Sequence, residues 1–238
     1  MRKVMLLVLT GALLCATAFS QINLGKNVNW RVYNYEPATK FLWDINKAAV
    51  SSGGIQFPIQ SFVDPTHGSF AVYLYANYNV DITGKIMTAT ATWTSGTYET
   101  RSTVAVSGCE GTPGYARLEF QDVTSGPYSE SDYWWSTGIA TPLALDLNAA
   151  QTGTLTASLA DPTLWSNLCG HLANDTNLYP DCITGNAGTM TPAAGFAKAT
   201  KNVKLVGLAF GSSCRYASGV AIAGTSVGNF TVSTFTIE

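Results

Sequence analysis

The segment 129–137 (SESDYWWST) places three consecutive aromatic residues directly after two carboxylates. Flat aromatic rings can stack on the apolar face of a pyranose, while carboxylates accept hydrogen bonds from its hydroxyls. A binding site needs only a few such polar groups for specificity. The pattern therefore predicts a carbohydrate-binding site. Its candidate residues are Glu130, Asp132, Tyr133, Trp134 and Trp135.

Successive side chains of a β-strand point to opposite faces, so Trp134 and Trp135 cannot both enter one core. We expect one of them in the core and the other at a concave or rim surface. A second aromatic group lies in segment 70–80, where Tyr73 and Tyr75 share a strand face and are further ligand-binding candidates. Packing is the alternative role, and we expect it for Trp30, Trp93 and Trp165.

Catalysis finds less support in the residue patterns. Glycoside hydrolysis needs two carboxyl groups about 5–10 Å apart, but the chain lacks the E-x-D-x-E signature of laminarinase-like hydrolases. A serine triad would need His67, which lies in a turn, or His171, which lies in a cysteine-containing loop. Isolated surface carboxylates are the alternative reading of the acidic candidates, which are Glu119, Asp122, Glu130 and Asp132.

Alternation of apolar and polar residues dominates the chain and predicts half-buried antiparallel strands. It is clearest in 87–94, where four threonines form the polar face, and recurs in 116–121 and 154–159. The apolar phase changes near Ser233-Thr234, which predicts a β-bulge. Segment 37–49 fits a helix or a hairpin, and we favour the hairpin. Further strands are expected at 28–35, 40–45, 55–62, 70–80, 98–106, 142–147, 203–210 and 217–223.

Many short strands separated by glycine and proline turns predict an all-β fold, an antiparallel β-sandwich or jelly roll. Helix is scarce. Asp161-Pro162 and Thr191-Pro192 each predict the capped start of a helix. We expect a single turn after the first and a helix that ends at Thr200 after the second. The long polar loop 166–190 lies between them, and loops of this length are usually functional or stapled.

The N-terminal segment 1–20 reads as a secretory signal peptide. It has a basic start and an apolar run at 4–14 that is too short to span a bilayer. Cleavage after Ser20 would leave one β jelly-roll domain over 21–238, exported to the extracellular space or periplasm, with no membrane span. Losing Arg2 and Lys3 takes the basic residues from 13 to 11 against 15 acidic ones, so the net charge falls from −2 to −4. No basic footprint for nucleic acid remains.

Four cysteines remain after export, and an even number in an oxidising compartment suggests two disulfides. Three pairings exist. We favour Cys169–Cys182, which closes the loop, with Cys109–Cys214, which joins distant strands. A metal–thiolate site is the alternative, but the chain has no C-x-x-C pair.

The order of motifs in the chain resembles a group of secreted, mostly uncharacterised bacterial proteins with a galactose-binding-domain-like β jelly roll. The resemblance runs from about residue 28 to the end and rests on 81–85 (DITGK), 117–121 (RLEFQ), 133–136 (YWWS), 165–167 (WSN), 196–197 (FA), 206–211 (VGLAFG), 219–221 (GVA) and 230–235 (FTVSTF). Many relatives end in a sorting anchor, whereas this sequence ends at Glu238.

The resemblance implies a carbohydrate-binding-module-like fold, and such modules often hold a structural Ca²⁺. Glu238 or Asp44 are the candidate ligands, and no other cofactor is expected. The first functional hypothesis is non-catalytic binding of an extracellular glycan. The second is a structural or protein-interaction role at a cell surface or in a matrix. A polysaccharide hydrolase or lyase is the third.

Overall fold

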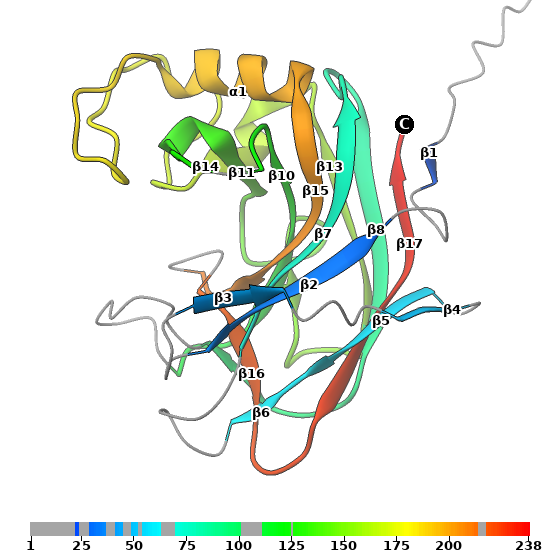
Figure 1. Cartoon of the computed structure of the whole chain (residues 1–238). Coiled ribbons are helices and arrows are strands. Elements are labelled where there is room, and N and C mark those ends of the chain that lie inside the picture. The colour runs from blue at the N-terminus through cyan, green and yellow to red at the C-terminus, as the bar shows by residue number, and fades with distance from the viewer. Residues whose placement is uncertain are drawn as a thin grey trace, which may run out of the picture.

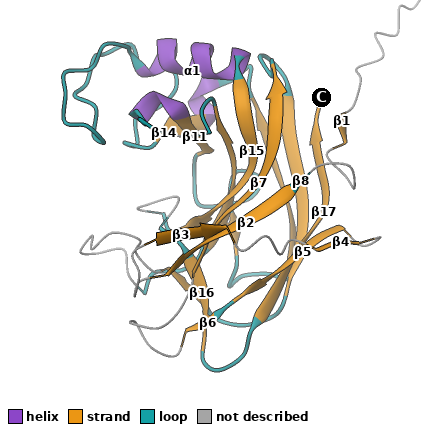
Figure 2. Ribbon diagram, in the orientation of Figure 1, coloured by secondary structure: helices purple, strands orange, loops and turns teal. Residues whose placement is uncertain are grey.

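The structure is a computed structural model in which two β-sheets pack face to face (Figure 1). It describes residues 22–23, 29–36, 41–44, 49–51, 54–62, 70–100, 111–124, 126–213 and 218–238. The predicted all-β antiparallel sandwich is confirmed, and Figure 2 shows how strands outnumber helices in it. The predicted signal peptide lies outside the described residues. Within those residues, no helix is long and apolar enough to cross a membrane.

Sheet A contains the strands that alternate most regularly. Its order is β13 (Thr152–Ser158), β8 (Ile86–Trp93), β17 (Gly228–Ile237), β5 (Gly54–Ile59) and β4 (Ala49–Ser51), with β1 (Ile22–Asn23) also paired to β17. The predicted bulge is present, because the register of β17 against β8 shifts between Val232 and Thr234. The shift lets Phe235 and Ile237 enter the core together with Phe230 and Val232.

Sheet B is longer and carries the residues of interest. Its main order is β14 (Trp165–Asn167), β11 (Tyr133–Ser136), β10 (Tyr115–Gln121), β15 (Val203–Gly211), β7 (Phe70–Val80), β16 (Val220–Ala223) and β6 (Ser61–Phe62). Further pairs add β12 (Leu145–Asp146) to β10, β2 (Trp30–Glu36) to β7, β3 (Phe41–Asp44) to β2 and β9 (Tyr98–Thr100) to β16. The antiparallel pairing of β3 with β2 confirms the hairpin over the helix.

The core lies between the sheets and is filled by the apolar face of each alternating strand. Trp30, Trp93 and Trp165 all belong to it, as expected. The opposite face of sheet A is hydroxylated. Threonines of β8 lie directly opposite threonines of β13 and β17, and Thr90 Oγ1 is 3.1 Å from Thr154 Oγ1. In sheet A, the two-residue alternation therefore separates a buried apolar face from a hydroxylated outer face.

Within the residues that the structure describes, three short helical elements lie between the strands. The 3₁₀ turn η2 (Pro162–Leu164) begins after Asp161, which accepts a hydrogen bond from the Thr163 N–H, and α1 (Pro192–Lys201) is capped in the same way by Thr191. Both starts were predicted from side chains that cap orphan N–H groups. The turn η1 (Glu130–Asp132) was not expected. Helix α1 packs on η1 and lies across one end of the sandwich (Figure 2).

Candidate binding site

The two adjacent tryptophans face opposite sides of sheet B. Trp134 lies in the core, where its ring meets Phe196 edge-on at 5.1 Å and its Nε1 donates to the Ser131 carbonyl. Trp135 points to the outer face, away from sheet A, because neighbouring strand residues alternate. The expected rim position is wrong, however, because Trp135 is only 1% exposed. The exposed rings on this face therefore belong to other residues.

A row of residues crosses the outer face of sheet B beside Trp135. Trp135 of β11 lies opposite Glu119 of β10, Glu119 opposite Gly207 of β15, and Gly207 opposite Tyr75 of β7. Gly207 has no side chain, so the Tyr75 hydroxyl reaches across β15 and donates to Glu119 Oε1 at 2.5 Å. A Cβ on Gly207 would also collide with the Leu74 carbonyl oxygen, so the position requires glycine.

Gln121 completes this group, which we name the Glu119 cluster: Tyr75, Glu119, Gln121 and Trp135. Gln121 Nε2 donates to Glu119 Oε1 at 2.9 Å and also to the Tyr75 hydroxyl. Trp135 lies directly opposite Glu119 and lowers the pKa of the Glu119 carboxyl. The sequence pattern assigned Glu119 and Gln121 to a polar strand face, but both are buried. Gly207, a glycine within the apolar run of β15, was the one sequence signal that a neighbouring side chain passes close over this strand.

The Glu119 cluster holds a carboxyl group whose burial favours the protonated form. Glu119 is completely buried, and this burial raises its pKa to about 8, although hydrogen bonds from Tyr75 and Gln121, and the neighbouring Trp135, act in the opposite direction. Burial and the nearby Glu119 carboxyl raise the pKa of Tyr75 well above its usual value. Because a buried ion without a counter-ion is costly, the cluster is an uncharged hydrogen-bonded unit.

Two stacked aromatic pairs flank the Glu119 cluster. Tyr73 stacks on Tyr75 with ring centroids 4.8 Å apart, and Tyr133 stacks on Trp135 at 6.0 Å. In each pair the second ring is buried, whereas Tyr73 and Tyr133 are partly exposed. Tyr128 extends the surface beside Tyr133. We name the accessible rings the tyrosine face; they are Tyr33, Tyr73, Tyr128 and Tyr133.

The tyrosine rings contact one another. The Tyr73 ring stacks on Tyr75, and the Tyr133 ring contacts Tyr128 at a tilted angle. Burial, with Tyr128 and Glu119 nearby, raises the pKa of Tyr133, so its hydroxyl stays protonated and remains a donor. These ring contacts hold the tyrosine side chains against one another.

Glu130 and Asp132, the carboxylates predicted to join the aromatic residues, do not lie at this face. Asp132 belongs to η1, where its Oδ2 accepts from the Ser129 N–H at 2.6 Å, and it neighbours Asp122. Asp122 pairs with Lys198 of α1 at 3.3 Å, and burial raises the pKa of Asp122 while Lys198 lowers it. Strand alternation does not extend through a 3₁₀ turn, so the five predicted residues do not form one site. Tyr133 and Trp135 lie at the outer face and Trp134 in the core, whereas Glu130 and Asp132 belong to η1. The four acidic candidates for hydrolysis therefore occupy three separate places.

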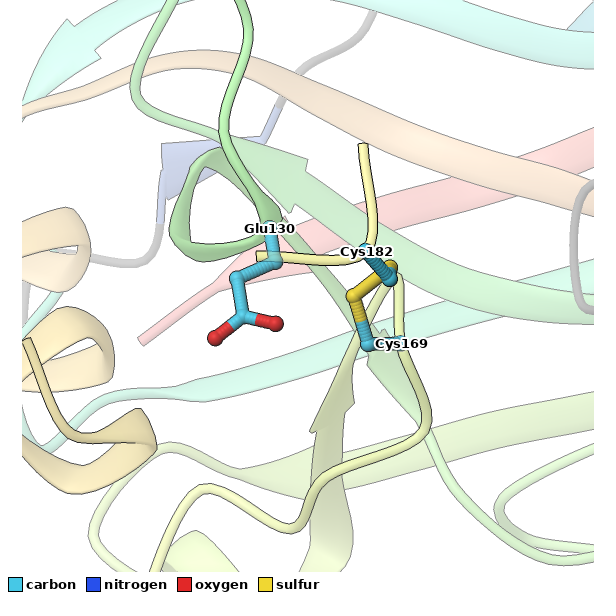
Figure 3. A group of neighbouring side chains, drawn as sticks. All are labelled: Glu130, Cys169 and Cys182. Carbon is cyan, nitrogen blue, oxygen red and sulfur yellow. A yellow bond between two sulfur atoms is a disulfide. The ribbon is translucent and has the colours of Figure 1, made fainter. Parts of the chain in front are cut away.

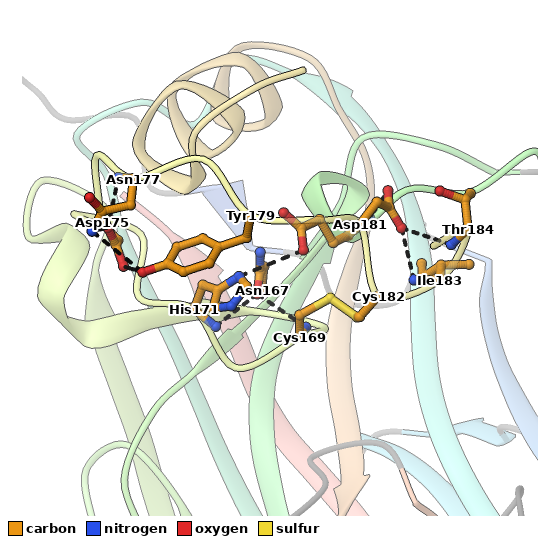
Figure 4. A network of polar contacts seen from close by, with 11 residues as sticks. Asn167, Cys169, His171, Asp175, Asn177, Tyr179, Asp181, Cys182, Ile183 and Thr184 are labelled. Atoms are coloured by element: carbon orange, nitrogen blue, oxygen red, sulfur yellow. Dashed lines mark hydrogen bonds and ion pairs between the residues drawn. A yellow bond between two sulfur atoms is a disulfide. The ribbon is translucent and has the colours of Figure 1, made fainter. Parts of the chain in front are cut away.

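Glu130 faces the loop closed by the Cys169–Cys182 disulfide, whose predicted pairing is confirmed. Glu130 Oε2 is 3.6 Å from His171 Nδ1, and the His171 ring stacks on Tyr179 at 3.8 Å (Figure 4). Tyr179 in turn donates to Asp175. Glu130 also lines a polar pocket of about 310 Å³ between η1, the loop and α1, together with Asp181, Thr184, Asn186 and Lys198.

Other predicted positions are more scattered. Cys109–Cys214 and His67 lie outside the described residues. The two calcium candidates belong to different sheets, since Asp44 pairs with β2 in sheet B and Glu238 follows β17 in sheet A. Segment 224–228 (GTSVG) spells the G-x-S-x-G pattern of a nucleophile elbow, but it joins strands β16 and β17. An elbow requires a strand followed by a helix.

Comparison with protein-family models and with curated protein sequences finds no match to this chain.

Proposed function

We propose that the protein is a secreted, non-catalytic carbohydrate-binding protein of jelly-roll type, and that the tyrosine face binds the glycan. The observation that carries the proposal is the pair of aromatic stacks on the outer face of sheet B. Each stack has a buried inner ring and a partly exposed outer ring, Tyr73 in one and Tyr133 in the other. A ring supported from beneath by another ring is a rigid apolar platform for a pyranose face.

Polarity also supports a glycan ligand. The hydroxyls of Tyr73, Tyr128 and Tyr133 supply donors and acceptors at the edges of the rings. The Glu119 cluster beneath them is uncharged at neutral pH, because the pKa of Glu119 is raised to about 8. We therefore expect neutral glycans to bind better than polyuronates, whose carboxylates find no buried cation in the cluster.

A binding panel tests the proposal. Soluble glycans and insoluble polysaccharides are incubated with the wild-type protein and with Tyr73→Ala and Tyr133→Ala, each checked for folding by circular dichroism. The matched control is Tyr179→Ala, which removes a partly exposed tyrosine of the disulfide loop. We expect each platform variant to weaken binding at least tenfold and the control to bind like the wild type.

The same samples discriminate the other functional classes. Released reducing ends or unsaturated sugars would replace the proposal by a hydrolase or lyase. Absence of both binding and product across the panel would favour a structural or protein-interaction role. Export is tested separately by N-terminal sequencing of the protein recovered after expression of the full chain, where we expect Gln21 as the first residue.

A further inference from the structure

Three side chains that suit a zinc ion gather at the base of the disulfide loop. The Sγ atoms of Cys169 and Cys182 and a carboxylate oxygen of Glu130 all lie within 4.8 Å of one another (Figure 3). The two sulfurs are joined in a disulfide, and a disulfide sulfur is not a thiolate ligand. We propose that reduction of this disulfide creates a Zn²⁺ site formed by the two thiolates, the Glu130 carboxylate and the His171 imidazole.

His171 lies next to Glu130 but outside the group of three whose ligand atoms are within 4.8 Å of one another, so the proposed fourth ligand requires that opening the disulfide bring the imidazole toward the two sulfurs. Its Nδ1 is 3.6 Å from Glu130 Oε2. Both atoms are buried, and neither has a hydrogen-bond partner within the described part of the chain. Zn–N, Zn–O and Zn–S bonds of about 2.0–2.3 Å place tetrahedral ligand atoms roughly 3.3–3.8 Å apart. The separation between Glu130 and His171 lies within this range, and two thiolates with one imidazole and one carboxylate are a zinc-type donor set.

Other residues of the loop also hold these ligands in position through hydrogen bonds and ring stacking. Asn167 Oδ1 accepts hydrogen bonds from the N–H groups of both Cys169 and His171, at 3.1 and 2.9 Å. The His171 ring stacks on Tyr179, whose hydroxyl bonds Asp175 at 2.7 Å. Partners of this kind hold metal ligands in place and raise affinity. Glu130 itself sits on η1, which Asp181 ties to the loop by accepting from the Glu130 N–H.

Disulfide and metal exclude each other, because the same two sulfur atoms serve in both. A dithiol reductant transfers two electrons and two protons to the S–S bond, giving two thiols while the reductant becomes a disulfide. Zinc binding then displaces the two thiol protons to solvent, so the ligands are thiolates. The proposed site is separate from the tyrosine face, and its occupancy depends on the redox state of Cys169 and Cys182.

Cobalt(II) spectroscopy of the full chain tests the proposal. Serines replace Cys15, Cys109 and Cys214 so that Cys169 and Cys182 are the remaining cysteines. A water-soluble phosphine reduces the disulfide and becomes a phosphine oxide with oxygen from water, which leaves no added thiol in solution. We expect the reduced protein to bind one Co²⁺ with thiolate charge-transfer bands and tetrahedral d–d bands, both abolished by one equivalent of Zn²⁺. The oxidised protein should show neither set of bands.

Variants separate the four-ligand site from simple binding by thiols. Glu130→Gln and His171→Asn should each weaken Zn²⁺ competition at least tenfold in the reduced protein. Glu238→Gln makes the same chemical change at an exposed carboxyl and should have no effect. The thermal melting of each oxidised variant shows whether it folds. Absence of cobalt–thiolate bands after reduction would overturn the proposal, as would unchanged affinity in both ligand variants.

Discussion

Replacing Glu119 by glutamine tests whether the fold holds this carboxyl in its uncharged form. Burial raises the pKa of Glu119 from 4.5 to about 8 in the folded protein. Between these two pH values the folded state binds more protons than the unfolded state. The stability of the wild type must therefore fall as pH rises from about 4.5 through 8. Glutamine cannot ionise, and its side-chain oxygen can still accept the hydrogen bond from Tyr75.

The size of the effect follows from the two pKa values. One pKa unit corresponds to about 1.36 kcal/mol. Integrating the proton-binding difference from pH 5 to pH 9 gives a loss of roughly 4 kcal/mol for the wild type relative to Glu119→Gln. Any bond that glutamine fails to make with Trp135 shifts the difference by a constant and leaves its pH dependence unchanged. This figure is an upper bound, because local relaxation around an ionised group reduces its cost.

Urea unfolding followed by tryptophan fluorescence at pH 5, 7 and 9 measures the effect. The free energy of unfolding of the wild type minus that of Glu119→Gln should decrease steadily as the pH rises from 5 to 9. Glu238→Gln, at an exposed carboxyl, is the control for the chemical change alone. A difference that stays constant within about 0.5 kcal/mol, far below the expected ~4 kcal/mol, would refute a neutral buried carboxyl at this position.

Three further predictions concern packing and cross-linking. Trp134→Ala should lower the free energy of unfolding by about 3–5 kcal/mol, since it empties a fully buried site against Phe196; calorimetry measures it. Gly207→Ala should destabilise by about 1–3 kcal/mol or more by forcing β15 from Leu74, and an unchanged melting temperature would contradict this. Cys182→Ser, which opens a loop with a sequence separation of 13, should cost about 3 kcal/mol in urea unfolding yet leave glycan binding intact.

Local features of the fold were predictable from the sequence. Asp161 and Thr191 cap their helices through hydrogen bonds that span two or three residues, so the signal lies within a few letters of sequence. The phase change at Ser233-Thr234 predicted the bulge for the same reason. The Cys169–Cys182 pair closes a short loop and was the favoured local pairing.

The candidate site was predictable only in part. Tyr73, Tyr75 and Tyr133 were identified as aromatic candidates. Their assembly around Glu119 depends on β15, which pairs with both β7 and β10 and so brings together Tyr75 and Glu119, 44 residues apart in the sequence. No local pattern encodes that register. Alternation also placed Glu119 at a polar face without revealing that tyrosines and Trp135 cover it. The unexpected turn η1 moved Glu130 and Asp132 away from Tyr133, because a 3₁₀ turn breaks the two-residue period.

Amide chemical-shift mapping tests most directly the proposal that a glycan binds at the tyrosine face. Isotope-labelled protein is titrated with each soluble glycan of the panel, and the shifted resonances are assigned to strands. We predict saturable shifts concentrated in β7, β10 and β11 around Tyr73 and Tyr133. Shifts confined to sheet A or to the pocket beside Lys198, or no shifts with any glycan, would contradict the account.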